Sequence, residues 1–436
     1  MKSSHRSKRP IDKRAPAFLA TFAILAATPC AADEVSADRS ETRLDGDAIT
    51  RTYAGEVSAT LRQTHITADS AVVDSWTDRY TFYRSVRFKD DRYLVYADNA
   101  VYDVDKEIAV LSGQVRLSDG EQTLSAGRIT YSAVKEQFEA RDSVQMKLAD
   151  GVSISTDFWF RDVSADTSVG EGNVGFTRDT SAAFRINAHR VLVKDSGEWL
   201  QFTRTVKMQQ GTWTAEADTA VYDRQVSNLL MIPNIKLSQY TESPGVSDST
   251  SARCNETRIQ MRDGRIDQID LSGEVQLAVV RYHAQGRSAS TVTSDTAVIE
   301  VQDEEVSIIR VRGRVLLQLH PAEALSSRLT AENTQITFES GAPAQIRVDG
   351  KGHLTYGTEA DSLHVDITGY GMTVSLRETR IHRVEVDSNT VCQIDGAQPI
   401  HLTGEQLILQ LSGQSLTSAE VKGAVQGRYK GVGTQP

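Results

Sequence analysis

The chain has 436 residues, of which 39% are hydrophobic, 24% charged and 6% aromatic, and its formal net charge is −10. This composition excludes a disordered chain and a bundle of membrane spans, and the length suits two or three ordinary domains or one long repeat array. The acidic balance argues against nucleic acid as a partner, because binding to phosphates needs a basic surface.

Residues 1–32 differ from the rest of the chain and are typical of a secretory signal peptide. Six basic residues precede an apolar run of 12 residues, Ala17–Thr28, and small residues follow at Cys30–Ala32. The run is shorter than the ~20 residues of a membrane-spanning helix, although an uncleaved N-terminal anchor is the alternative. Removing these residues leaves 42 of the 48 basic and 57 of the 58 acidic residues, a net charge of −15. We therefore predict an exported, acidic protein.

A unit of about 29 residues recurs from residue 57 onward. Each copy contains a box of small residues that ends in an aromatic residue and an acid, as in ADNAVYD at residues 97–103 and ADTAVYD at residues 217–223. Matched spacing of two separate elements indicates a true internal repeat. The second element is an alternation of polar and apolar residues, centred on Val57, Val86, Val115, Val144, Val174, Val206 and Ile235.

Residues 238–253 are rich in Ser, Thr, Gly and Pro and interrupt this spacing. This composition predicts a loop and a domain boundary there. Beyond it the unit lengthens to about 37–40 residues, with valine elements at Val275 and Val315 and a box at residues 294–300. We predict a first domain over residues 33–242 and a second, more divergent one over residues 243–436. One continuous array is the alternative.

Both elements have the period-2 alternation of half-buried strands, and they are rich in Val, Ile, Thr and Tyr. Turn signals separate them, among them Asp119-Gly120, Asp263-Gly264 and Asp349-Gly350. The sequence therefore predicts an all-β fold, an elongated repeat array of about two dozen antiparallel strands. A unit of two strands cannot bury its own apolar face, so stacked neighbours would build one core and leave free strand edges at the ends.

The sequence carries no motif for catalysis, metal binding or a cofactor. The nine histidines are dispersed, and neither HExxH nor CxxC occurs. The acids that end the boxes, Asp74, Asp103 and Asp223, recur regularly, which favours a role in turns over one in catalysis. We therefore predict no enzyme activity, no metal and no cofactor. The box aromatics are expected to lie in the core or at its rim: Tyr102, Tyr131, Trp159 and Tyr222.

Two cysteines, Cys254 and Cys392, remain after removal of the predicted signal peptide. They lie in units about three layers apart, which is roughly 15 Å at ~4.8 Å per layer. A disulfide needs Cα atoms within about 7 Å of each other, so we predict that both are unpaired.

The box followed by G-x-V-x-L resembles the units of the OstA-like family. These are periplasmic lipopolysaccharide (LPS) transport proteins of the LptA and LptC kind and the N-terminal domain of the outer-membrane LPS assembly protein. The likeness covers residues 57–237 well and 254–425 loosely, and it is carried by Ala97-Asp98 to Tyr102-Asp103 with Gly113, Val115 and Leu117, and by Ala217-Asp218 to Tyr222-Asp223 with Ile235 and Leu237.

The resemblance implies an OstA-like twisted, partly open β-jellyroll, V-shaped in section, in the periplasm. Its apolar groove would shield LPS or a related lipid, and other Lpt-type β-jellyrolls would join it edge to edge. Shielding acyl chains is worth roughly 0.8 kcal/mol per CH2. The residues that we expect to line the groove are same-face pairs: Val115/Leu117, Val144/Met146, Val174/Phe176, Val206/Met208, Ile235/Leu237, Val275/Leu277 and Val315/Leu317.

Two other functions remain open at this point. A structural or adhesive β-solenoid would have the same strands around a fully packed core without lipid. A polysaccharide-processing β-helix enzyme would need a cluster of acids, Arg or His that breaks the repeat on one face, and the sequence indicates none.

Overall fold

The computed structural model describes residues 34–429 except for 13 short gaps: 46–47, 62–63, 90–93, 119–122, 133, 149–150, 180–182, 284–285, 322–324, 358–362, 378, 396–398 and 413–414. The predicted signal peptide, residues 1–32, lies outside the described residues. The described part of the chain forms 29 strands and one short 3-10 helix, η3 (Asp195–Gly197). None of its helices is long and apolar enough to cross a membrane.

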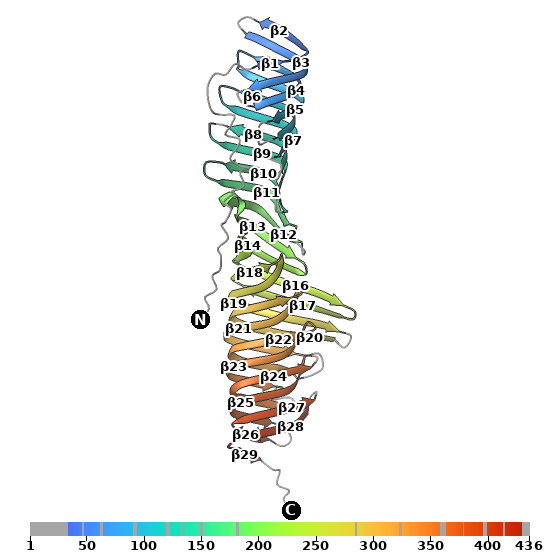
Figure 1. Ribbon diagram of the computed structural model, residues 1–436. Helices are drawn as coiled ribbons and strands as arrows, with labels where there is room; N and C mark the ends of the chain where they lie inside the picture. The colour runs from blue at the N-terminus through green and yellow to red at the C-terminus, as the bar shows by residue number, and fades with distance from the viewer. Residues whose placement is uncertain are drawn as a thin grey trace, which may run out of the picture. The chain divides into compact units, whose positions relative to one another are not determined.

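The chain divides into two compact units (Figure 1). The first comprises Met1–Arg178 and Ala188–Phe202, and the second comprises Asp179–Asn187 and Thr203–Pro436. These bounds differ from those of the predicted domains, 33–242 and 243–436, which remain a prediction about the repeats.

Within each unit, consecutive strands pair antiparallel as a stack of layers (Figure 1). The strands of the first unit are β1 (Glu34–Ser36), β2 (Arg39–Asp45), β3 (Ala48–Leu61), β4 (Thr64–Asp74), β5 (Arg79–Lys89), β6 (Leu94–Asp103), β7 (Ile108–Ser118), β8 (Thr123–Ser132), β9 (Gln137–Lys147), β10 (Val152–Asp162) and β11 (Thr167–Arg178). Both units contain parts of β12 (Phe184–Lys194) and β13 (Trp199–Gln210).

The strands of the second unit are longer on average, in line with its longer repeat. They are β14 (Trp213–Asp223), β15 (Asn228–Ile232), β16 (Ile235–Ser243), β17 (Val246–Cys254), β18 (Glu256–Arg262), β19 (Arg265–His283), β20 (Gly286–Gln302), β21 (Glu305–His320), β22 (Ser327–Glu339), β23 (Ala342–Tyr356), β24 (His364–Arg377), β25 (Arg380–Asp395), β26 (Ile400–Gly404), β27 (Gln406–Ser412), β28 (Ser415–Lys422) and β29 (Gln426–Tyr429).

Five consecutive pairs of these strands are halves of one interrupted strand: β1/β2, β15/β16, β17/β18, β26/β27 and β28/β29. β17 and β18, for example, both pair with β19. Subtracting the five interruptions from the 29 described strands leaves 24, as the repeat predicted. The predicted antiparallel all-β fold is confirmed.

Most long strands carry a β-bulge near their middle. In β7 the bulge lies at Gly113 and Gln114, whose φ angles are +77° and +44°, and the pairing with β6 and β8 shifts there. The G-x-V motif therefore signals the bulge, because glycine adopts left-handed backbone without strain. A bulge bends its strand, so each layer consists of two half-strands.

These half-strands form two arms in each unit. The Val arm contains the valine side of each bulge, such as residues 115–118 of β7 and 275–282 of β19, with their ladder partners. The Tyr arm contains the other side, residues 108–112 of β7 and 265–272 of β19, with their partners, among them Tyr102 and Tyr131. The backbone of each arm is hydrogen-bonded within that arm.

Two of the predicted turns can be checked. Asp263-Gly264 is the turn between β18 and β19, as predicted, with φ angles of +51° and +77°. The prediction for Asp349-Gly350 is wrong, because these residues form the bulge inside β23, where the pairing with β24 shifts and Gly350 has φ +99°. Both structures need left-handed backbone, which is why the same dipeptide serves each. Asp119-Gly120 lies outside the described residues.

Candidate functional site

All fourteen predicted groove residues are buried, with exposed fractions from 0% to 4%. Each pair follows the bulge of its strand, so the structure brings all fourteen to the inner face of the Val arm. In the first unit these are Val115, Leu117, Val144, Met146, Val174 and Phe176, and in the second they are Val206, Met208, Ile235, Leu237, Val275, Leu277, Val315 and Leu317.

Cross-strand pairing joins these residues into continuous apolar rows. Directly opposite residues of antiparallel strands lie on the same face, so each row marks one wall of the interior. In the first unit the row runs through Phe88, Val95, Leu117, Leu124, Met146, Ile154 and Phe176. In the second unit it runs through Leu237, Ala252, Leu277, Val292, Leu317, Leu329, Leu354, Ile367, Cys392 and Leu402.

The Tyr arm supplies a second apolar wall that the sequence reasoning missed. In the first unit its row mixes large and small side chains, which alternate except at the neighbours Leu111 and Ile129, and this suits close packing of neighbouring layers: Ala71, Phe82, Ala100, Leu111, Ile129, Ala140, Trp159 and Gly170. In the second unit six isoleucines follow one another directly: Ile259, Ile269, Ile299, Ile309, Ile336 and Ile346.

The two arms meet through aromatic side chains. In the first unit Phe176 of the Val arm lies edge-on to Phe202 of the Tyr arm, with ring centroids 5.6 Å apart. In the second unit Phe184 and Tyr222 make the corresponding contact at 5.4 Å. The box aromatics Tyr131 and Trp159 are buried as predicted. At these layers the interior is filled by protein side chains.

In several layers the second residue of the box lies over the bulge of the next strand. A Cβ added to Gly113 would lie 2.2 Å from Oδ2 of Asp98, so glycine is required by space as well as by φ. The matching carboxylate of Asp295, on β20, accepts hydrogen bonds from the backbone N–H and the guanidinium of Arg314, on β21. The box and the G-x-V motif therefore contact each other in these layers, and the contact recurs at Asp157/Gly172. An acid also lies over a bulge glycine at Asp38/Gly55 and Asp387/Gly371, although Asp387 lies on β25, the strand that follows Gly371.

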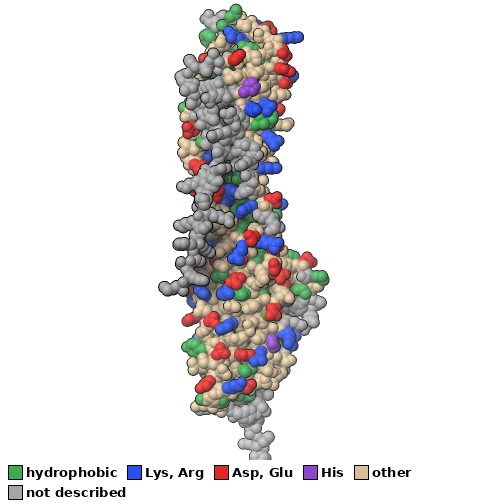
Figure 2. Space-filling model, viewed as in Figure 1, with side chains coloured by type: hydrophobic (Ala, Val, Ile, Leu, Met, Phe, Trp, Pro, Cys, Tyr) green, Lys and Arg blue, Asp and Glu red, His purple; other side chains and the backbone are tan. Residues whose placement is uncertain are grey.

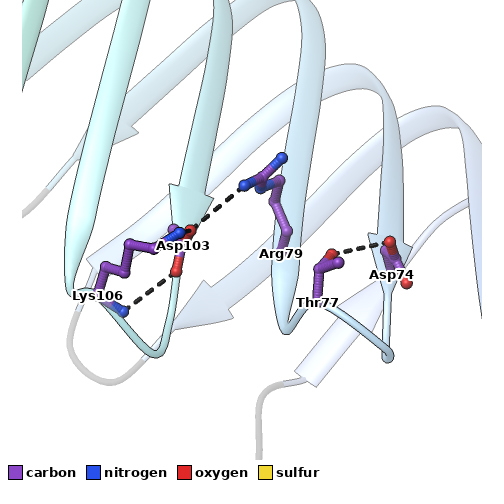
Figure 3. Close-up of polar contacts among 5 residues, drawn as sticks. All are labelled: Asp74, Thr77, Arg79, Asp103 and Lys106. Carbon is purple, nitrogen blue, oxygen red and sulfur yellow. Dashed lines mark hydrogen bonds and ion pairs between the residues drawn. The ribbon is translucent and has the colours of Figure 1, made fainter.

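The acids that end the boxes hold turns, as predicted (Figure 3). Asp74 accepts hydrogen bonds from the backbone N–H of Trp76 and the hydroxyl of Thr77, at 3.0 and 2.8 Å. Asp103 accepts bonds from the backbone N–H and the ammonium group of Lys106, at 3.1 and 2.9 Å. The bond from Thr77 lowers the pKa of Asp74, and the bond from the Lys106 ammonium lowers the pKa of Asp103. Asp103 also accepts a hydrogen bond of 3.4 Å from the guanidinium of Arg79 on β5, so both carboxylates are engaged in turn and neighbouring-strand contacts.

The outer surface is polar. On the face shown in Figure 2, acidic and basic side chains are interspersed over the described residues. A cleft of about 460 Å³ lies at the bulges of β21–β23, between Arg312, Asn333, Gln335 and Asp349. Its polar walls do not suit acyl chains. Among the described residues, no group of three or more His, Cys, Asp or Glu side chains is arranged to hold a metal ion.

Both cysteines are unpaired, as predicted, and both are buried. Cys392 belongs to the inner row of the Val arm, and its burial raises the pKa of the thiol to about 12. Burial likewise raises the pKa of Cys254, whose Sγ lies 3.0 Å from Oγ1 of Thr257.

Comparisons with known proteins agree with the pattern of the first unit. Residues 34–137 match the family model of the LptA/(LptD N-terminal domain) LPS transport protein. Among solved structures, LptH of Pseudomonas aeruginosa, an LptA-homologous periplasmic component of the LPS transport device, matches at 16% identity over 31% of this chain and 79% of its own, with a TM-score of 0.18. A search of curated proteins gave no match. The family model thus places the likeness of residues 34–137 in the OstA-like family, which the box and the valine element had indicated.

Proposed function

We propose that this protein shields the acyl chains of LPS, or of a related lipid, between its Val arm and its Tyr arm during transport to the outer membrane. The observation that carries the proposal is the pair of apolar walls, each continuous over consecutive layers and each turned toward one interior. Hydrocarbon chains need only an apolar surface of this kind, and each CH2 kept from water is worth roughly 0.8 kcal/mol. The role is passive and requires no catalytic group.

The location and the partners follow from the same proposal. The match of residues 34–137 to the family model and the predicted signal peptide support a periplasmic protein associated with the outer-membrane pathway. The end strands offer edges for pairing with other Lpt-type β-jellyrolls. At one end β2 pairs with β3 and its side chains are exposed along the whole strand. At the other end β28 pairs with β27.

Photo-crosslinking tests the proposal. A photo-reactive amino acid is placed at Val144 or Val206, inside the Val arm, and in a control at Gln145, the outward-facing neighbour on β9. We expect light-dependent LPS adducts at the two inner positions and none at Gln145. If a folded protein forms no adduct at any inner position, the proposal is wrong.

A structural β-solenoid without lipid is the second candidate, and a specific observation favours it. The aromatic contacts Phe176–Phe202 and Phe184–Tyr222 fill the interior at their layers. Under this alternative the inner rows pack only against each other. LPS would then leave the stability of the protein unchanged, whereas a ligand bound to the native state raises it.

A further inference from the structure

In the second unit, the inner row of three Val-arm strands ends in a polar side chain. On β13 the inward sequence is Val206, Met208 and then Gln210, and on β16 it is Ile235, Leu237 and then Gln239. On β19 the inward positions end in Arg281. The two glutamines are exposed by only 2% and 5%. Buried polar groups need partners, so these three side chains require an explanation.

All three side chains donate a hydrogen bond across to the tip of the Tyr arm. The side-chain amide of Gln210 donates to the carbonyl of Gly264, in the turn between β18 and β19. That of Gln239 donates to the carbonyl of Glu304, in the turn between β20 and β21. The guanidinium of Arg281 donates to the carbonyl of Ser340, in the turn between β22 and β23, at 2.7 Å.

Arg281 is itself held in place. Its guanidinium makes two hydrogen bonds of 2.7 Å to Asp248, the residue directly opposite on β17. The Tyr-arm turn lies against this pair, since a Cβ added to Gly341 would be 2.7 Å from Oδ2 of Asp248. The bond to Ser340 therefore forms between two fixed groups.

The three bonds recur at regular intervals along the unit. Successive donors lie two strands apart in the Val arm, and each acceptor turn lies two strands beyond the previous one. Since the backbone of each arm is bonded within its own arm, the tips are joined by side chains at these points. Parting the tips would break these bonds and leave the strand ladders intact.

We propose that Gln210, Gln239 and Arg281 form a seam that closes the side of the second unit's interior and must open to admit acyl chains. This inference rests on the proposed function. It implies two states of the unit, one empty with the tips joined and one loaded with the tips apart. The polar end of the lipid would face the tips, where the carbonyl groups of the three turns become free to accept hydrogen bonds from it.

The first test uses the native cysteines of the full chain. Cys254 lies in the interior opposite Ile235, so its alkylation by N-ethylmaleimide requires the arms to part. The seam variant combines Gln210→Met, Gln239→Met and Arg281→Met, which keep bulk and remove the donors. We expect alkylation of Cys254 to be faster by at least about tenfold, because the open population rises exponentially as bonds are lost.

The matched control combines Gln209→Met, Gln276→Met and Arg253→Met, outward-facing residues of the same region. It should leave the alkylation rate unchanged. Circular dichroism establishes that each variant is folded. An unchanged rate in a folded seam variant would show that these bonds do not close the interior.

The second test locks the tips covalently at the place of one seam bond, the bond from Gln239 to Glu304. In a Cys254→Ala and Cys392→Ala background, Gln239→Cys and Glu304→Cys are joined by a reducible bifunctional thiol reagent, and a photo-reactive residue replaces Leu277. We expect LPS adducts to disappear in the locked protein and to return on reduction. Equal adducts before and after reduction would overturn the seam while leaving the proposed function in place. Adducts in neither state, with adducts at Val144, would confine lipid binding to the first unit and also overturn the inference.

Discussion

The contact between a box acid and a bulge glycine gives a sharp stability prediction at Gly313. This residue has φ +96°, and a Cβ there would lie 2.2 Å from Oδ2 and 2.6 Å from Cβ of Asp295. Gly350, in the same unit, has φ +99° with no atom within 4 Å of its added Cβ. Gly350→Ala therefore isolates the left-handed strain, about 1–2 kcal/mol. Gly313→Ala adds to that strain the displacement of Asp295.

The added cost at Gly313 follows from what Asp295 does. Its carboxylate accepts the backbone N–H of Arg314 at 3.3 Å and the guanidinium at 3.2 Å. Losing these exposed bonds costs about 0.5–1.5 kcal/mol, and the Cβ overlap forces a further shift of the strand. We expect Gly313→Ala to lower the free energy of unfolding by roughly 2–4 kcal/mol.

A double-mutant cycle tests whether this loss of stability arises from the contact between residues 313 and 295. Asp295→Ala should not rescue Gly313→Ala, because the Cβ of residue 295 remains in the way, whereas Asp295→Gly should reduce the penalty to the strain alone. Urea unfolding followed by circular dichroism gives the free energies, and hydrogen exchange of β20–β22 shows whether the loss is local. Equal costs at Gly313 and Gly350, independent of residue 295, would refute the reasoning.

Three further predictions concern the interior and the turns. Ile309→Ala, in the inner isoleucine row, should cost about 2–5 kcal/mol, and Ile308→Ala on the other face of β21 much less; equal losses in urea unfolding would contradict the assigned faces. Cys392, with a pKa of about 12, should resist thiol reagents at pH 8 in the native protein and react fully in denaturant; rapid native labelling would show an accessible interior. Bonds from Ser164 and Gln137 lower the pKa of Asp162 to about 2, so its contribution to stability is complete above pH ~4 and is lost as the pH falls toward 2; Asp162→Asn should flatten this part of the stability–pH curve, and an unchanged slope would argue against it.

The valine elements could be placed from the sequence because their alternation is unbroken. Between Leu111 and Leu117 of β7 the inward positions keep the same parity through the bulge, so Val115 and Leu117 are recognisable as a same-face pair. The burial of all fourteen residues is therefore predictable from period 2 alone. That lipid lines this face remains a proposal.

The apolar wall of the Tyr arm was not predicted because the strands that contain a box, such as β6, change which alternate positions face inward. In β6 the inward residues are Val95 and Ala97 before the shift and Ala100 and Tyr102 after it. The bulge in β7 adds one residue opposite this point, and the alternation in β6 moves by one position. A pattern extended across the box with strict period 2 therefore assigns half of the strand to the wrong face.

The seam was beyond sequence reasoning for a different reason. Gln210, Gln239 and Arg281 continue the inward alternation, which is a visible signal that a polar side chain ends an apolar row. Their partners, however, are backbone carbonyls, which carry no residue-specific pattern. Which turn each donor reaches depends on the twist of the two arms relative to each other. This twist cannot be inferred from the period-2 alternation of the strands.

The two arms and the seam differ in how far apart along the chain their partners lie, and this difference sets an order of folding. Ladder bonds join each strand to one of the next three strands, so the arms can grow layer by layer as the chain becomes available. The seam bonds span 54, 65 and 59 residues. The turn that accepts a seam bond thus follows its donor by several strands along the chain. A chain that ends after β21 would have its strands stacked up to that point but would hold Arg281 without the carbonyl of Ser340.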